Sequence, residues 1–451
     1  MSTAASWLRA GVIAGAGVAA CHFTPGNPLG GGGDARPIED AGCPDAVATC
    51  DGDVLVTTCD GGSGSQLGSE TCPWGCTLTA GPHCEQLVPS GGGLLLGDVA
   101  AGSNLTTTSL GSDLFVDGDT GAIGSAGNPT SVRGSGSGVM NGIDFEERDP
   151  IAMFRFASLG VIGTVHLVGT HPIALVADGE ISIGSTLDVT GSCANSAPGP
   201  GGFAGGSAAG ADGSGSGGGT GAAAASLAGG GGGFGGTGGG GANGASAAQH
   251  QAGGVVYGDP TLALLVGGGG GAAGGGGATF GPGGGGGGAV QLESNTSVVI
   301  GNQGVINAGG CGGVSGTMTN NGGGGGGAGG AILIEAPLVT VMGTLAVNGG
   351  GGGGGGTTTA SAGQSGQPSQ AAAMGTSGGA GTAAGGNGAS NMMADGMNGG
   401  NMAMQAAGGG GGVGRIRLNT RNNMGLSPTG SVLSPPLMSG TTTTAGSAAV
   451  R

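Results

Sequence analysis

Residues 159–169 read LGVIGTVHLVG, and residues 181–191 read ISIGSTLDVTG. The apolar positions of these two segments coincide at an offset of 22 residues. The same pattern returns as VTVMGTLAVNG at residues 339–349 and, with one inserted residue, as VVIGNQGVINAG at residues 298–309. Because apolar residues that alternate with period two are typical of β-strands, the chain is organised by a strand-forming repeat.

Each copy of the repeat follows a shorter alternating segment. These segments are residues 154–156, 173–175, 290–292 and 331–334, and a last, degenerate copy begins at residues 414–418. Two or three short strands in such a unit fit one coil of a parallel β-helix. No coil can bury its inward Val, Ile and Leu side chains alone, so neighbouring coils stabilise one another. The sequence therefore predicts an all-β fold with a parallel β-helix, or β-solenoid, over residues 94–451.

Long glycine-rich insertions interrupt the repeat at one recurring point, at about residues 194–288, 312–330 and 350–412. They are either flexible, solvated linkers or packed polyglycine in an extended helix with three residues per turn. The sequence lacks a strict Gly-X-Y period, which excludes collagen. Residues 255–257 and 262–266 are expected to form a further strand docked on the β-helix. Insertions on one edge of a repeat fold often form its functional face.

Two cysteines support this alignment of the repeats. Cys193 lies two residues after Gly191, and Cys311 lies two residues after Gly309, so they occupy equivalent positions. On neighbouring coils they would lie one strand spacing apart, about 4.8 Å, which is compatible with a disulfide. The sequence predicts a Cys193–Cys311 bridge, and the alternative is two independent buried cysteines.

The first 21 residues form an export signal. Arg9 precedes a short apolar stretch, residues 10–20, which is too short to span a bilayer and ends in small residues. The run VAAC at residues 18–21 resembles a bacterial lipobox. That resemblance implies diacylation of Cys21 with acyl chains such as palmitate and, because residue 22 is not Asp, transfer to the outer membrane. An ordinary signal peptide with an incidental Cys21 is the alternative, and residues 22–42 are expected to form a flexible tether.

A cysteine-rich segment follows at residues 43–88. An even number of closely spaced cysteines in an exported protein predicts a disulfide module, with 15 possible pairings for three bridges. Zinc binding through Cys72, Cys76 and His83-Cys84 is the competing interpretation. The runs CDGDVLVT and CPWGC resemble small modules near the N-terminus of bacterial surface lipoproteins. The six cysteines are Cys43, Cys50, Cys59, Cys72, Cys76 and Cys84.

Charge and composition exclude several classes of function. The formal net charge is −16, so nucleic acids would repel the chain. The nine basic residues are all Arg, and without Lys there is neither Schiff-base chemistry nor a P-loop lysine. We expect no cofactor, although calcium remains an option at the acidic residues considered next.

The acidic residues are few for an enzyme of the β-helix class, which would need clustered carboxylates on neighbouring coils. Glu293 and Glu335 follow equivalent strand positions; they are either stacked, with a cation between them, or solvated turn carboxylates. Asp113, Asp117 and Asp119 are candidate calcium ligands or parts of a Gly-Asp turn.

The charged run at residues 144–149 is expected to form a solvated cap over the open end of the β-helix. Residues 94–451 as a whole resemble glycine-rich surface proteins of Gram-negative bacteria with predicted β-helical cores. The resemblance to mycobacterial glycine-rich repeat proteins is more distant.

The expected function is that of a non-catalytic cell-surface lipoprotein with a structural or adhesive role. Its partners would be the membrane, through the lipid anchor, and a surface polysaccharide or protein; nucleic acid is excluded. A carbohydrate-active β-helix enzyme, such as a polysaccharide lyase or hydrolase, and a passive surface spacer are the alternatives.

Overall fold

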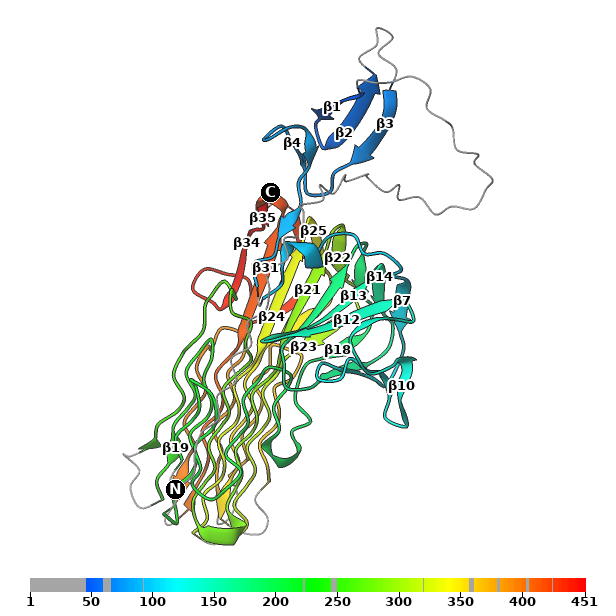
Figure 1. Ribbon diagram of the computed structural model, residues 1–451. Helices are drawn as coiled ribbons and strands as arrows, with labels where there is room; N and C mark the ends of the chain where they lie inside the picture. Colours follow the sequence, from blue (N-terminus) through cyan, green and yellow to red (C-terminus); the bar gives the residue numbers. More distant parts are fainter. Residues whose placement is uncertain are drawn as a thin grey trace, which may run out of the picture.

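The protein is built from long parallel β-sheets, and its only helices in the described residues are single 3₁₀ turns. The computed structural model describes residues 46–59, 66–91, 93–221, 224–244, 250–318, 320–356, 361–378, 382–402, 405–423 and 425–451. The 3₁₀ turns are η1 (Leu96–Asp98), η2 (Ala194–Ser196), η3 (Gly277–Thr279) and η4 (Arg421–Asn423). Figure 1 shows a small module at one end, the parallel sheets in the middle, and long extended segments at the other end.

Three large sheets, here named A, B and C, hold most of the strands. Sheet A has the order β11 (Gly138–Met140), β12 (Ile143–Arg148), β13 (Ile151–Phe156), β16 (Ile173–Ala177), β21 (Ala289–Ser294), β24 (Ala331–Ala336), β31 (Arg415–Thr420), β34 (Thr443–Ser447). Sheet B has the order β32 (Leu426–Ser427), β25 (Leu338–Val341), β22 (Ser297–Ile300), β17 (Ile181–Ile183), β14 (Ser158–Val161), β7 (Thr107–Leu110). Sheet C has the order β10 (Asn128–Arg133), β9 (Ile123–Ser125), β8 (Leu114–Asp117), β15 (Val165–Val168), β18 (Thr186–Asp188), β23 (Val305–Asn307), β26 (Thr344–Ala346), β33 (Val432–Ser434).

The chain passes from sheet A to B to C and then returns to A, so each passage adds one parallel strand to every sheet. In sheet B, the strand pairing places Leu159 beside Ile181, Ile181 beside Val298, and Val298 beside Val339. These are the positions that the sequence repeat aligns. The glycine-rich insertions leave after β18, β23 and β26 and return to sheet A at β21, β24 and β31.

The inward side chains of the three sheets form one continuous core. Val161, Leu175, Leu292 and Ile334 are among the many members that are completely buried. Each such side chain stabilises the fold by about 1.5–3 kcal/mol relative to exposure. The core begins earlier than the repeat in the sequence, because β7 and β8 already pair with β14 and β15.

A second apolar cluster lies on the outer face of sheet A. Leu94 and Val99 pack there against Met153, Leu262 and Leu265, together with Leu333 and other apolar residues. The strand predicted at residues 255–257 and 262–266 is wrong, because no strand forms there and Leu262 has a positive φ of 58° after a turn. Leu262 and Leu265 nevertheless dock on the sheet, whereas Val255 and Val256 are exposed.

The charged run before the first predicted strand is itself a strand. Residues 144–148 belong to β12, which pairs antiparallel with β13 and with β11. The run forms a hairpin at the end of sheet A, in which Phe145 points into the core while Glu146 and Glu147 are exposed. Arg148 forms an ion pair with Asp98 at 2.5 Å, which joins the hairpin to η1.

The small N-terminal module is an antiparallel sheet held by disulfides. The bridges Cys50–Cys76 and Cys72–Cys84 are present, and Cys59 is also disulfide-bonded. The proposed zinc ligands Cys72, Cys76 and Cys84 are therefore engaged in bridges. Cys21, Cys43, the signal peptide and the tether lie outside the described residues. The strands are β1 (Ala46–Asp51), β2 (Val54–Cys59), β3 (Gln66–Thr71), β4 (Cys76–Thr77), β5 (His83–Cys84) and β6 (Leu87–Val88), which pairs with β35 (Ala449–Val450).

Candidate functional surface

The glycine-rich insertions fold as a bundle of extended runs that are hydrogen-bonded to one another. The run 322–330 illustrates the pattern, because its successive N–H groups donate to three different neighbouring runs. A repeat of three residues per turn is that of a polyproline II-type helix, which has no internal hydrogen bonds. The donor–acceptor pairs are Gly322–Gly275, Gly325–Ala272 and Ala328–Gly269; Gly323–Ala406, Gly326–Gly409 and Gly329–Gly412; and Gly324–Val314, Gly327–Cys311 and Gly330–Ala308.

The carbonyl groups of the same run accept hydrogen bonds from three further runs. The donors lie in residues 281–287, 229–232 and 350–353. The run 322–330 therefore has six hydrogen-bonded neighbours, and the parallel course of these segments is visible in Figure 1. Of the two structures left open by the sequence, the packed one is present. The donor–acceptor pairs are Gly281–Gly322, Gly284–Gly325 and Gly287–Ala328; Gly229–Gly323 and Gly232–Gly326; and Gly353–Gly324 and Gly350–Gly327.

Glycine is required in this bundle for space. A Cβ atom on Gly325 would lie 2.1 Å from the carbonyl oxygen of Gly230, and one on Gly327 would lie 2.1 Å from that of Gly285. Neither residue has a positive φ, so conformational freedom is not the reason. Short antiparallel pairs close the runs: β19 (Gly241–Ala242) with β20 (His250–Gln251), β27 (Gly355–Gly356) with β28 (Thr382–Ala383), and β29 (Asn401–Met402) with β30 (Gln405–Ala406).

A disulfide links the first insertion to the second. It joins Cys193 to Cys311 with a Cα–Cα distance of 5.4 Å, the pair for which the sequence analysis expects a bridge. Cys311 is completely buried and donates its N–H to Gly285, so the bridge attaches the start of the first insertion to the interior of the bundle.

Exposed methionines are concentrated on the last insertion. Its runs are hydrogen-bonded to one another, because Gly388 donates to Ala373 and Met397 donates to Asn387, and to the first insertion, because Gly396 donates to Thr237. The backbone beneath the methionines is therefore fixed, although their side chains are 44–59% exposed. We refer to Met374, Met392, Met393, Met397 and Met402 as the methionine surface.

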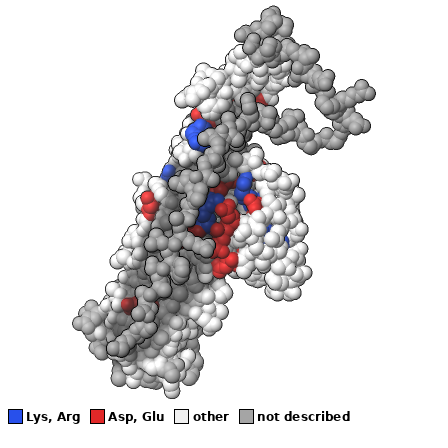
Figure 2. Space-filling view, in the orientation of Figure 1, with Lys and Arg blue, Asp and Glu red and all other residues white. Residues whose placement is uncertain are grey.

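The bundle carries very little charge. No Lys or Arg occurs between Arg155 and Arg415. Figure 2 shows the charged side chains of one face gathered near the middle of the molecule, with few over the described part of the bundle. Exposed apolar side chains gathered on one part of a protein are typical of contact sites.

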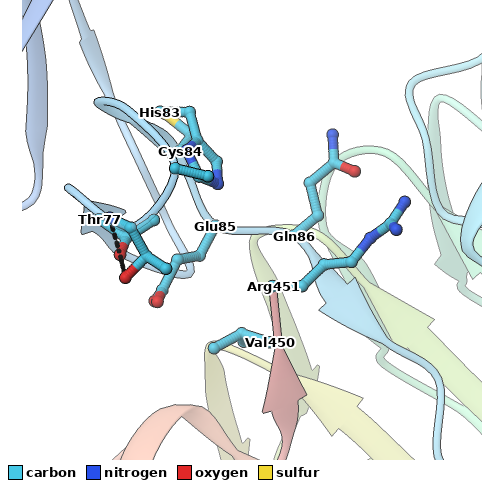
Figure 3. A pocket seen from close by; sticks show the side chains of 9 residues that line it. Thr77, His83, Cys84, Glu85, Gln86, Val450 and Arg451 are labelled. Carbon is cyan, nitrogen blue, oxygen red and sulfur yellow. Dashed lines mark hydrogen bonds between the residues drawn. The ribbon is translucent and has the colours of Figure 1, made fainter.

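A cavity of about 620 Å³ lies between the disulfide module and the end of the chain. Its lining includes Thr77, His83, Glu85 and Arg451. In Figure 3 the side chains of Glu85 and Arg451 point in different directions, and the hydrogen bond drawn joins the hydroxyls of Thr77 and Thr79. His83 uses its Nδ1 atom for the carbonyl oxygen of Gly81 at 2.8 Å. The described lining therefore offers no paired acid and base.

The three calcium candidates do not converge. Asp117 accepts hydrogen bonds from the turn residues Asp119 and Thr120, whereas Asp119 accepts from the N–H and hydroxyl of Thr170 and contacts His171. Within the described ranges, no three His, Cys, Asp or Glu side chains are grouped as a metal site. Burial raises the pKa of Asp119, but the hydrogen bonds from Thr170 and His171 outweigh it and leave the pKa lowered.

Glu293 and Glu335 are stacked and buried. They are paired residues on β21 and β24, with exposed fractions of 1% and 0%. The alternative of solvated turn carboxylates is wrong, because residues 90–91 and 93–99 cover this part of sheet A. The sequence signal was available: alternation places Gln291, Glu293 and Glu335 on the outer face, opposite the inward Leu292 and Ile334.

No family model, curated protein or solved structure matches this chain. Among the helices of the described residues, none has the length and apolar character needed to cross a membrane.

Proposed function

We propose that this chain is a non-catalytic, lipid-anchored protein of the bacterial outer membrane. In this proposal sheets A, B and C form a parallel β-helix that supports the glycine bundle. The bundle is a rigid adhesive or structural element, and the methionine surface is its contact site for a protein or polysaccharide partner. The acyl chains on Cys21 attach the molecule to the membrane.

The packing of the glycine runs is the observation that carries this proposal. Ordering the backbone of one residue costs about 1–2 kcal/mol, and glycine loses the most freedom of all residues. A chain that needed only a tether would not order so many glycines in six-neighbour contacts. The bundle therefore supports a role in which a surface is held at a defined position, which a passive spacer does not require.

The β-helix is supported by the cyclic order of the strands. Each of the passages that begin at β13, β16, β21, β24 and β31 continues to sheet B and then to sheet C. The insertions all leave from the C-to-A corner, so they project together from one edge. Insertions on one face are the arrangement expected of a functional face in a repeat fold.

The methionine surface is suited to contact with a partner. Methionine is flexible and polarizable, so it adapts to apolar surfaces of different shapes. Exposed apolar groups on a rigid support also lose little entropy of the backbone when they bind.

The lipid anchor is tested by labelling. A Gram-negative host that expresses the full chain is grown with radiolabelled palmitate, beside the variant Cys21→Ser. We expect label in the wild-type protein and none in the variant, with the wild-type protein in the outer-membrane fraction. Equal labelling of both would refute lipidation at Cys21.

Adhesion is tested with the same cells. Attachment to immobilised host proteins and polysaccharides is compared between wild type and the variant Met393→Ser/Met397→Ser, which removes exposed side chains without touching the glycine backbone. The control is Met318→Ser, which changes a methionine that is 58% exposed and lies on the second insertion. We expect the double variant alone to lose attachment; full attachment by it would refute the contact role.

A further inference from the structure

A groove of about 470 Å³ lies on the last insertion, and three extended runs line it. The runs lie side by side, because Gln364 donates its N–H to the carbonyl oxygen of Met374 and Gly385 donates to that of Thr376. In a helix with three residues per turn, side chains three residues apart share one face. We name this site the amide groove. Its lining includes the pairs Ser361 and Gln364, Met374 and Ser377, and Ala384 and Asn387.

The groove presents two side-chain amides that the backbone of the middle run holds in place. The Oε1 atom of Gln364 accepts the N–H of Met374 at 3.1 Å. The Oδ1 atom of Asn387 accepts the N–H of Gly375 at 2.9 Å. Each amide nitrogen carries two hydrogens, and among the residues that the structure describes neither nitrogen donates to a protein group. Both nitrogens are therefore free to donate to a ligand.

The rest of the lining combines hydroxyl and apolar groups. Ser361 and Ser377 are exposed, and Met374 is 54% exposed. Methionine is flexible and adapts to the apolar surface that it meets. A sugar ring offers the matching groups, because hydroxyl groups surround its edge and C–H groups cover its two faces.

The segment that forms the groove carries no charge. Residues 336–394 contain no Asp, Glu, Lys, Arg or His. A charged ligand would therefore find no opposite charge among these residues, although charged partners are normally recognised by complementary charge. The lining thus favours an uncharged ligand with many hydroxyl groups.

We propose that the amide groove binds a neutral polysaccharide chain. The amides of Gln364 and Asn387 donate to its oxygens, the hydroxyls of Ser361 and Ser377 exchange hydrogen bonds with it, and Met374 packs on the C–H face of a ring. Cavities of about 300–1,000 Å³ hold small ligands, so the groove takes a short stretch of the chain. This inference rests on the proposed function, because Met374 is also part of the methionine surface and the polysaccharide is the partner of that surface.

Titration with neutral tetrasaccharides tests the proposal. Maltotetraose, cellotetraose and tetra-N-acetylchitotetraose are each titrated into the oxidised full chain in a calorimeter, with anionic heparin as the charged comparison. We expect saturable binding of at least one tetrasaccharide and much weaker binding of heparin. The proposal is overturned if none of the three tetrasaccharides binds, or if heparin binds as tightly as they do.

Two variants of unchanged shape remove only the outward donors. Gln364→Glu and Asn387→Asp keep the oxygen that accepts the backbone N–H, so the Tm should stay close to that of the wild type. Each variant should raise the Kd of the tetrasaccharide roughly tenfold, because one hydrogen bond to the ligand is lost. Unchanged affinity in both variants would overturn the assignment of the groove.

Two further variants complete the comparison. Gln370→Glu is the matched control, since Gln370 is exposed on the same insertion but does not line the groove, and its Kd should equal that of the wild type. Met374→Ala removes the apolar contact and no side-chain hydrogen bond. It should also raise the Kd, and it decides the matter if the amide variants fold poorly.

The failure of this inference differs from the failure of the proposed function. If a tetrasaccharide binds in the groove but Met393→Ser/Met397→Ser leaves cell attachment intact, the contact role of the methionine surface fails and the groove stands. If attachment depends on those methionines but no tetrasaccharide binds, the groove is overturned and the proposed function stands, with a protein as the partner.

Discussion

Substitution of a single central glycine should destabilise the whole bundle, and Gly325→Ala is the sharpest case. Gly325 lies in the run with six neighbours, where its N–H donates to Ala272 and its carbonyl accepts from Gly284. The new Cβ would lie 2.1 Å from the carbonyl oxygen of Gly230, although ordinary contacts begin near 3.4 Å. The runs must separate by roughly 1 Å or more to accept one methyl group, since backbone atoms cannot rotate away.

The expected loss combines two effects. Overpacking a well-packed interior lowers the stability by about 1–3 kcal/mol, and each hydrogen bond that is broken lowers it by about 1 kcal/mol. Alanine also lowers the conformational entropy of the unfolded chain, which offsets about 0.4–1 kcal/mol of this loss. We therefore expect Gly325→Ala to lower the free energy of unfolding of the bundle by about 2–4 kcal/mol.

Gly378→Ala is the matched control. Gly378 also lies in the bundle and has no positive φ, but its Cβ would meet its nearest atom, Ala384 Cβ, at 3.4 Å. This variant should be neutral or slightly more stable. Hydrogen exchange measured by mass spectrometry on peptides from residues 229–241, 322–330 and 405–414 reports the difference, because the amides of these runs are protected only while they pack. Equal protection in Gly325→Ala and Gly378→Ala would refute the packing argument.

Three other predictions concern the attachment of the bundle, the response to acid and the end of the core. Cys193→Ser/Cys311→Ser opens a bridge with a sequence separation of 118 residues, so denaturant unfolding should show a loss of about 2–4 kcal/mol; a loss below about 1 kcal/mol would contradict its role. In the variant Asp119→Asn, the free energy of unfolding should decrease less steeply as the pH is lowered. Because hydrogen bonds from Thr170 lower the folded pKa of Asp119 despite its burial, its contribution is present above the unfolded value, about 3.9, and is lost as pH falls through the folded pKa. Tm measured from pH 7 to pH 2 checks this, and parallel curves for variant and wild type would refute it. Arg133→Met should cost about 3 kcal/mol in thermal unfolding, since completely buried Arg133 donates to five main-chain carbonyls, including those of Gly121 and Ile143; an unchanged Tm would show that water replaces it.

The sequence predicts the strands of the core well because their side chains carry the pattern. The residues that alternate at 159–191 and at 339–349 form paired strands in the register that the repeat predicts. The equivalent positions of Cys193 and Cys311 in the repeat likewise predict that they are neighbours. The first strands of the core, β7 and β8, were missed. β7, with the sequence TTSL at residues 107–110, contains a single large apolar residue, and β8, at residues 114–117, lies outside the sequence repeat.

The bundle could not be predicted in the same way. A run of glycines has no side chain whose period could reveal a helix, so the choice between packed and flexible depends on backbone contacts between distant segments. Burial of Glu335 was also missed for a long-range reason. The segment that covers it comes from residue 90, which lies 245 residues away in the sequence.

The three-residue repeat of the runs sets how the reach of the bundle can change. One residue in such a helix advances the chain by about 3.1 Å and rotates the next group by about 120°. We call the bundle an arm and its end farthest from sheets A, B and C the tip. Removal of one glycine from a run therefore shortens the arm and also rotates the tip to face a different direction. Removal of three from each of two connected runs withdraws the tip by about 9 Å with its orientation kept. Variation in arm length is thus easiest in whole helical turns, and a graded series of such deletions would give arms of stepped length that present the same tip.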